Sequence, residues 1–287
     1  MIGLTFTSST GWPAETTHIR LWDVGVTWRD IHTAPGTFDW TRLDMLVAQA
    51  GGRHLTYVIG ATPRWLAKDP NTTNAATWLG PGSNSMPWSM TYATEFVSAL
   101  VTRYKGRIAA YEVWNEPQLV PFLTPWDAAT RNALASLTQI AKGIISTTDP
   151  AAYCLSGAIL PRPSSGGITR AGLYLDALAA KGWPIDGFTT HIYPEEGQGV
   201  DRWTWMLAQA RTAIAAAPKQ RLWVTETNYG VPSPTTIPDA QTPALIDGAM
   251  AAAGKSAVWW YAWQRPDLGG ILLDYPTAAW TALKTYA

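Results

Sequence analysis

The chain has 287 residues, a formal net charge of zero and 15% charged residues. Its length fits two small domains or one (β/α)8 barrel of about 250 residues, and its balanced charge argues against a nucleic-acid or anionic-membrane surface. The single cysteine, Cys154, excludes an intramolecular disulfide and a cysteine-rich zinc site.

The chain begins with MIGLTFTSSTGW, which has neither the basic region nor the apolar core of a signal peptide. This pattern is consistent with a cytoplasmic or phage-associated protein, or with secretion after removal of a leader. No stretch has the roughly 18 apolar residues that cross a membrane, so membrane insertion is not expected.

Short apolar and β-branched runs alternate with helical patterns along the rest of the chain. Strands are predicted at 2–6, 18–24, 54–60, 108–115, 153–160, 186–193, 221–227 and 257–263. Helices are predicted at 40–50, 89–104, 126–147, 170–181, 201–216, 239–253 and 277–286. Start signals for three of these helices are Ser89, Thr124 with Pro125, and Asp239.

Near-continuous apolar strands separated by helices are typical of a parallel sheet. Eight such units predict a single-domain (β/α)8 barrel over residues 1–287. An open doubly wound sheet is the alternative, but no glycine-rich phosphate-binding turn follows the first strand. Only the first strand lacks a helical pattern before the next one.

Two of the seven glutamates, Glu116 and Glu226, end the fourth and seventh predicted strands. Barrel enzymes place their active sites at the C-terminal ends of the strands. If the alternate positions that include these residues face the interior, the two carboxylates meet across the barrel mouth. A separation of about 5–5.5 Å is typical of a retaining glycosidase, and repulsion with partial burial is then expected to raise the pKa of one carboxyl. The alternative is an ordinary ion pair with Arg20 or Arg64.

Further polar and aromatic residues fall at the same predicted rim. Candidate substrate-binding residues are Arg20, Trp65, Asn115, His191, Tyr193, Asn228 and Trp263. His191 taken alone also fits a buried core histidine, and Trp65 either borders the cleft or packs in its loop. The 17 tryptophans against 5 phenylalanines either fill the core or line a cleft where indole faces stack on sugar rings.

These motifs resemble clan A glycoside hydrolases, the (β/α)8 retaining glycosidases, and are similar to members of families 39 and 5. WNEP at 114–117 is similar to the strand-four signature, which implies that Glu116 is the acid/base and that Asn115 binds the sugar 2-hydroxyl. VTETNYG at 224–230 resembles the segment that carries the nucleophile, here Glu226.

The same resemblance extends to three other strand ends. HIYP at 191–194 is similar to the strand-six segment, which implies a hydrogen bond from Tyr193 to the nucleophile. Arg20 matches an arginine near the nucleophile, and Trp263 matches the aromatic floor of the subsite before the cleaved bond.

The sequence therefore predicts a retaining glycoside hydrolase acting on a poly- or oligosaccharide, such as a bacterial cell-envelope glycan. A carbohydrate-binding barrel without catalysis and a transglycosidase with the same residues are the alternatives. No metal site is expected, because the four histidines have no HExxH or similar spacing. A serine nucleophile is not expected either, because no GxSxG segment is present. No cofactor is expected. The expected partner is the carbohydrate substrate, bound by a monomer.

Overall fold

The computed structural model describes residues 2–6, 12–162, 167–194, 198–228, 242–254, 257–263 and 278–286. Eight strands in these ranges pair in parallel in the order β7-β6-β5-β2-β1-β10-β9-β8. They are β1 (Ile2–Phe6), β2 (His18–Leu21), β5 (His54–Ile59), β6 (Ile108–Val113), β7 (Tyr153–Leu155), β8 (Phe188–Ile192), β9 (Leu222–Thr227) and β10 (Val258–Trp263).

The strands at the two ends of this order, β7 and β8, also meet. Two parallel bridges join their flanks, one between Leu155 and Gly187 and one between Ile159 and Thr190. The sheet is therefore a nearly closed barrel, and the fold predicted from the sequence is confirmed.

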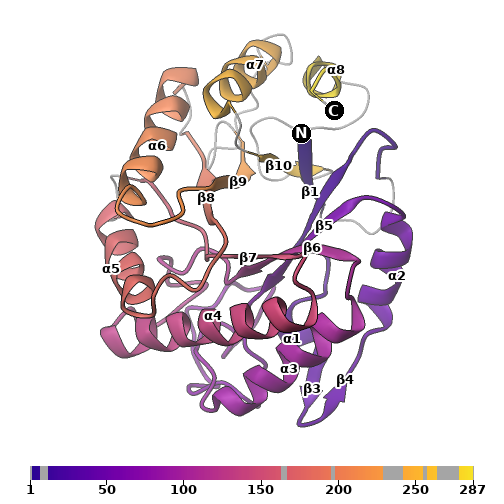
Figure 1. Ribbon diagram of the computed structural model, residues 1–287, viewed down its shortest axis with the longest axis vertical. Helices are drawn as coiled ribbons and strands as arrows, with labels where there is room; N and C mark the ends of the chain where they lie inside the picture. The colour runs from indigo at the N-terminus through magenta and orange to yellow at the C-terminus, as the bar shows by residue number, and fades with distance from the viewer. Residues whose placement is uncertain are drawn as a thin grey trace.

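Within the described ranges, seven helices surround the strands as an outer ring (Figure 1). They are α2 (Thr41–Ala50), α3 (Met90–Arg103), α4 (Ala128–Thr148), α5 (Gly167–Ala180), α6 (Val200–Ala213), α7 (Thr242–Ala253) and α8 (Ala278–Lys284). Ser89 caps α3 as predicted, accepting from the Thr91 amide. The cap of α4 is Asp127 rather than Thr124 and Pro125. The predicted start of α7 at Asp239 lies outside the described residues.

One substructure between β2 and α2 is not predicted by the sequence pattern. It comprises α1 (Trp28–Ile31) and a hairpin of β3 (His32–Ala34) and β4 (Thr37–Phe38). Each element is shorter than the window in which hydrophobic periodicity is visible. Aromatic packing holds the substructure against α3, since Trp28 stacks on Phe96 with ring centroids 5.4 Å apart.

Seven of the described tryptophans are buried in the core. Five are among the largest fully buried side chains, namely Trp28, Trp114, Trp203, Trp259 and Trp260. Burying a large apolar side chain contributes about 1.5–3 kcal/mol, so these indoles are a large part of the stabilising area. No described helix combines the length and the hydropathy that crossing a bilayer requires.

Candidate active site

A cluster of charged side chains fills the C-terminal half of the barrel interior. Arg20 enters from β2, Glu112 from β6, His191 from β8 and Glu226 from β9. The first three are fully buried, and Glu226 is 6% exposed. Charges in such a place are costly unless they are paired, so their contacts define the site.

Glu116 reaches this cluster by a turn of the backbone rather than by strand alternation. β6 ends at Val113. Beyond it φ is +82° at Trp114 and +39° at Glu116, in the left-handed region that non-glycine residues seldom adopt. The indole of Trp114 donates to the Phe122 carbonyl at 2.8 Å and remains in the core. Strain of this kind concentrates where a side chain must be aimed.

Glu226 is positioned by a bulge in β9. Thr190 pairs with Val224, but the next residue of β8, His191, pairs with Glu226, so Thr225 is skipped. Simple alternation would place Thr225 and Glu226 on opposite faces. Both side chains instead reach the buried cluster, Thr225 contacting Glu112 at 3.4 Å. Bulges re-aim side chains in this way near active sites.

Arg20 joins three acceptors. Its Nε and Nη2 donate to the two carboxylate oxygens of Glu112 at 2.8 and 3.1 Å. Nη1 donates to Glu226 at 2.5 Å, and Nη2 also donates to Asn115 Oδ1 at 2.8 Å. Burial alone would lower the pKa of Arg20, but the charges of Glu112 and Glu226 raise it far above its ordinary value. The arginine is a permanent cation beside Glu226.

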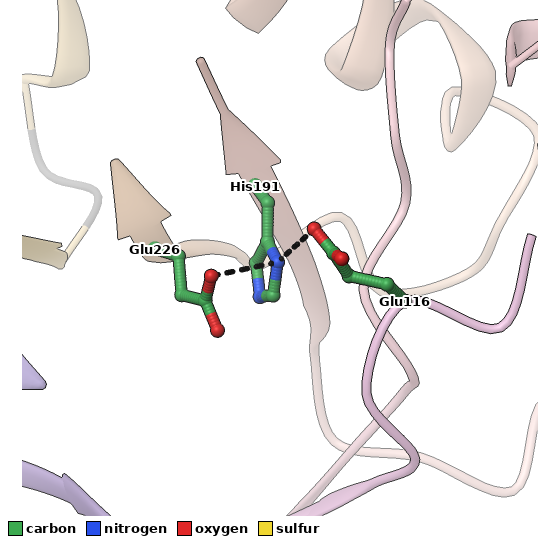
Figure 2. A group of neighbouring side chains, drawn as sticks. All are labelled: Glu116, His191 and Glu226. Carbon is green, nitrogen blue, oxygen red and sulfur yellow. Dashed lines mark hydrogen bonds and ion pairs between the residues drawn. The ribbon is translucent and has the colours of Figure 1, made fainter. Parts of the chain in front are cut away.

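His191 lies between the two predicted catalytic carboxylates (Figure 2). Its Nδ1 is 2.9 Å from Glu116 Oε1 and 3.4 Å from Glu226 Oε2. The far ring nitrogen, Nε2, is 3.8 Å from Glu112, an ion-pair distance too long for a hydrogen bond. The Tyr193 hydroxyl donates to Glu226 Oε2 at 2.7 Å, as the resemblance implies.

These contacts decide where the proton of the site resides. Burial lowers the pKa of His191, but the carboxylates of Glu226, Glu112 and Glu116 raise it to about 9. Burial raises the pKa of Glu116, but the hydrogen bond and charge of His191 outweigh burial and hold it below its usual range. The expectation of a raised carboxyl pKa is therefore wrong for Glu116, because a cation lies between the two carboxylates. The two pKa shifts favour protonated His191 beside an ionised Glu116.

A cleft of about 260 Å³ opens above the cluster. Its described lining residues are Trp22, Asp23, Trp78, Asn115, Glu116, Leu119, Phe122, Arg162, Tyr193, Glu226 and Asn228. Five of the predicted site residues are in this set, and the predicted Arg20 and His191 lie directly beneath them. Six other lining residues were not among the candidate substrate-binding residues: Trp22, Asp23, Trp78, Leu119, Phe122 and Arg162.

Two predicted substrate-binding residues differ from the rest. Trp65 is not a lining residue of the cleft. Its indole donates to the His32 carbonyl at 2.8 Å and packs edge-on against Tyr92. Trp263 is the last residue of β10, and its side chain lies outside the described part of the chain. A loop tryptophan gives no periodicity from which its direction can be predicted.

The residues missed by the sequence analysis all come from loops after strand ends. Arg162 lies two residues beyond the predicted fifth strand, so its place at the rim was a usable signal. Trp78 lies in the long segment between β5 and α3, and its indole is 53% exposed beside the buried Trp22. Nothing in the sequence distinguishes Trp78 from the core tryptophans.

The same three side chains also match the donor set of a metal site. One ligand atom from each of Glu116, His191 and Glu226 lies within 4.8 Å of the others. Imidazole and carboxylate groups bind Zn²⁺ and similar ions, so a metal role needs its own test.

A larger cavity of about 740 Å³ lies around the N-terminal ends of the strands. It is lined by His18, His54, Trp223, Trp259 and other residues, and no carboxylate is among its described lining residues. Burial and the neighbouring His54 lower the pKa of His18 to about 4. The described lining of this cavity has no carboxylate pair, so the facing carboxylates of the smaller cleft mark the candidate active site.

The fold and the site together define a (β/α)8 barrel with two facing carboxylates in its mouth. No family model matches the chain, and no curated protein matches its sequence. Among solved structures, an endoxylanase of glycoside hydrolase family 10 from a sugarcane soil metagenome has a TM-score of 0.70 at 15% identity, over 99% of this chain and 96% of that one.

Two further structures extend the comparison. A family 10 protein from Paenibacillus barcinonensis has a TM-score of 0.65 at 16% identity, over 99% of this chain and 93% of that one. A glucosidase from Croceicoccus marinus has a TM-score of 0.64 at 13% identity. The match covers 86% of this chain but 54% of the glucosidase, so this chain spans about half of that protein. At these identities the likeness shows the fold.

Proposed function

We propose that the chain is a single catalytic domain and a retaining glycoside hydrolase that cleaves a poly- or oligosaccharide. The observation that carries this proposal is the approach of Glu116 and Glu226, whose nearest oxygens lie within 4.8 Å of each other and of His191. Retaining enzymes have carboxyl groups about 5–5.5 Å apart, whereas inverting enzymes need about 6.5–9.5 Å to admit a water.

In the first step a Glu226 oxygen attacks the anomeric carbon while the bond to the leaving oxygen breaks. Glu116 delivers a proton to that oxygen, which leaves as an alcohol. In the second step Glu116 takes a proton from water, the water oxygen attacks the anomeric carbon, and the Glu226 carboxylate is released. Atoms and charge balance over the two steps.

His191 and Glu116 are proposed to act as one proton-holding pair. The proton on Nδ1 is one hydrogen bond of 2.9 Å from Glu116. A glycosidic oxygen beside Glu116 offers a new acceptor, and the proton then passes through Glu116 to that oxygen. Two interacting groups of this kind titrate as a pair, not as separate sites.

The remaining contacts suit a nucleophile in the ionised state. Arg20 and Tyr193 each hold one oxygen of Glu226, which fixes the plane of the carboxylate. Asn115 accepts from Arg20 through Oδ1, so its amide nitrogen is left to donate to a sugar hydroxyl. Asn228 and the aromatic residues of the cleft would contact the rest of the glycan, and Trp263 would support the sugar at the cleaved bond.

The comparisons support the proposal at the level of fold, since several neighbours are named as xylanases and one as a glucosidase. The placement of this chain within clan A is part of the proposal and rests on the WNEP, HIYP and VTETNYG segments, which resemble families 39 and 5.

The decisive experiment traps the intermediate. A panel of activated 2-fluoro glycosides is incubated with the protein, and labelled peptides are identified by mass spectrometry. The expected adduct is on Glu226. Glu226→Ala should lower kcat by roughly 10⁴-fold or more, by analogy with other removed nucleophiles. Added azide should then restore turnover of this variant, and the product should be a glycosyl azide of inverted anomeric configuration.

The control variant is Glu95→Ala, since Glu95 is a partly exposed glutamate of α3 outside the cleft. It should keep the wild-type rate, and EDTA should leave that rate unchanged, which separates this mechanism from a metal-dependent one. Absence of any adduct together with intact sugar binding would identify a carbohydrate-binding barrel instead. Product analysis with added sugar acceptors separates hydrolysis from transglycosylation.

A further inference from the structure

Arg162 lies on the wall of the cleft, beyond the end of β7, together with Glu116 and Tyr193. Its guanidinium carbon is 5.8 Å from the centre of the Tyr193 ring. Its positive charge is one of the influences that lower the pKa of Glu116, after His191. The guanidinium is thus close to the bond-breaking position.

The Arg162 guanidinium makes no hydrogen bond or ion pair with any described residue. Its Nε is buried and has no partner. Arg20 is the contrast within the same site, because it donates to Glu112, Glu226 and Asn115. An unpaired donor on a partly buried cation is unfavourable, so a cleft residue of this kind indicates an acceptor brought by a ligand.

Most other arginines in the described ranges donate to a carbonyl or a carboxylate. Arg170, Arg202 and Arg221 also have no hydrogen bond there, but each stacks over an aromatic ring at 4.2–5.2 Å and none lines the cleft. Arg162 alone among these four faces the place where a substrate would lie. Holding its own loop in place therefore does not account for its position.

We propose that Arg162 binds an anionic substituent of the glycan, specifically the carboxylate of a uronic acid residue. This inference rests on the proposed function and adds the substrate class to it. The planar guanidinium presents a fork of N–H donors that matches a carboxylate in two parallel hydrogen bonds. Trp22 and Trp78, whose rings meet edge-on in the same cleft, supply apolar faces for the sugar rings.

The test uses uronate-bearing polysaccharides, glucuronoxylan and a bacterial exopolysaccharide among them, each in native and carboxyl-reduced form. Carbodiimide activation and borohydride reduction convert the carboxylates into neutral hydroxymethyl groups and leave the linkages intact. Wild-type protein should prefer at least one native polymer by about tenfold or more in kcat/KM, the range of a charged hydrogen-bonded pair. Arg162→Gln should lose this preference, and Arg162→Lys should keep part of it.

Binding is measured separately by calorimetry on Glu226→Gln, with oligosaccharides from the same native and reduced polymers. Arg64→Gln is the control, because Arg64 is an exposed arginine of a neighbouring loop and does not line the cleft. Thermal unfolding midpoints verify that each variant is folded. Each rate ratio is taken at the variant's own pH optimum, since losing the Arg162 charge also shifts the pKa of Glu116.

Equal binding and hydrolysis of native and reduced polymers by wild-type protein would overturn the proposal, as would a preference that survives in Arg162→Gln. If the protein forms the adduct at Glu226 but shows no preference for carboxylate-bearing polymers, only the proposed role of Arg162 is refuted and the hydrolase proposal stands. A protein that forms no trapped adduct yet binds native oligosaccharides through Arg162 refutes the hydrolase and leaves the anion site standing.

Discussion

Three buried carboxylates and two buried cations make up the centre of this site. Arg20 and protonated His191 face Glu112, Glu116 and Glu226, so the group is one positive charge short of neutrality. Protonating Glu116 completes the balance, and this is the state that an acid catalyst needs. Glu112 is therefore more than a structural partner of Arg20, because its charge favours the extra proton.

Replacing Glu112 by Gln tests this role. The carboxylate is 3.8 Å from His191 Nε2, and an opposite charge at that distance shifts a pKa by about 1–3 units. Loss of the charge lowers the pKa of the His191–Glu116 pair. The alkaline limb of the kcat/KM profile should move to lower pH by about one unit or more. Glu112→Asp, which keeps the charge, should restore much of the wild-type profile.

The groups around Glu112 that can contribute to this shift are Arg20, His191, Glu116, Glu226 and the Tyr174 hydroxyl. Glu112→Gln should also lower stability, since it leaves a buried Arg20 with fewer partners. A purely structural residue would lower the unfolding midpoint and leave the pH limb in place. That outcome would refute the positioning role.

The raised pKa of His191 makes a second prediction, for the pH dependence of stability. Its folded-state pKa is about 9, against about 6.5 when unfolded, so its contribution is complete below pH 6.5 and is lost as pH rises through 9. The unfolding free energy of wild type relative to His191→Asn should fall by up to about 3 kcal/mol over that window. Urea denaturation at several pH values measures this difference.

His32 provides a control of opposite sign. Burial lowers its pKa to about 4, so its neutral form is favoured in the folded protein. The unfolding free energy of wild type, measured relative to that of His32→Asn, should therefore fall as pH falls from 6.5 towards 4. If both histidine variants followed the same trend, the assignment of the proton to His191 would be wrong.

At the scale of elements, the end of β6 combines the proposed acid/base residue with backbone strain. Glu116 has a φ of +39°, which glycine tolerates and other residues resist by about 1–2 kcal/mol. Glu116→Gly should therefore be more stable than Glu116→Ala by about 1 kcal/mol in urea denaturation. Both variants lose the carboxylate, so the difference isolates the backbone. As a control, glycine in place of Ala110 inside β6 should lower the stability of the protein. Equal stability of Glu116→Gly and Glu116→Ala would exclude backbone strain at this position.

The barrel strands and the outer helices were predictable from their apolar runs and helical periodicity, whereas α1, β3 and β4 are too short to show either signal. The local geometry that aims the proposed catalytic residues was not predictable. Alternation predicted inward carboxylates, yet Glu116 arrives through a left-handed turn and Glu226 through a bulge at Thr225. The turn and the bulge both depend on packing against neighbouring strands and helices. Neither can be predicted from the residues of its own segment.

At the scale of the whole molecule, the site residues were easier to predict from the sequence on strands than on loops. Residues carried on strands, such as Arg20 and His191, were predicted because parallel strands bring their ends to one rim. Trp78 and Arg162 belong to loops, whose paths are set by packing over the barrel mouth. Trp65 was assigned to the cleft from its loop position, and the contact of its indole with the His32 carbonyl turns it away.

The β7–β8 seam is where the barrel closes, and it depends on side chains as well as on the two bridges. The Thr189 amide donates to Ser156 Oγ at 3.1 Å, and the Thr189 hydroxyl donates to the Ser156 carbonyl at 2.9 Å. Ser156 and Thr189 are fully buried. His191 follows Thr189 by two residues on β8, so the geometry of the seam affects the position of the proposed proton-holding pair, His191 and Glu116.

Ser156→Ala should therefore destabilise the protein by about 1–3 kcal/mol, because the buried Thr189 amide loses its partner. Hydrogen exchange should speed up at β7 and β8 more than at β1, β2 and β5, and kcat/KM should fall with the loosened His191. Ser136→Ala is the matched control, since its exposed hydroxyl only donates back to Asn132 within α4. Exchange that rises evenly over all strands, or a loss of stability no larger than that of Ser136→Ala, would show that the seam does not depend on Ser156.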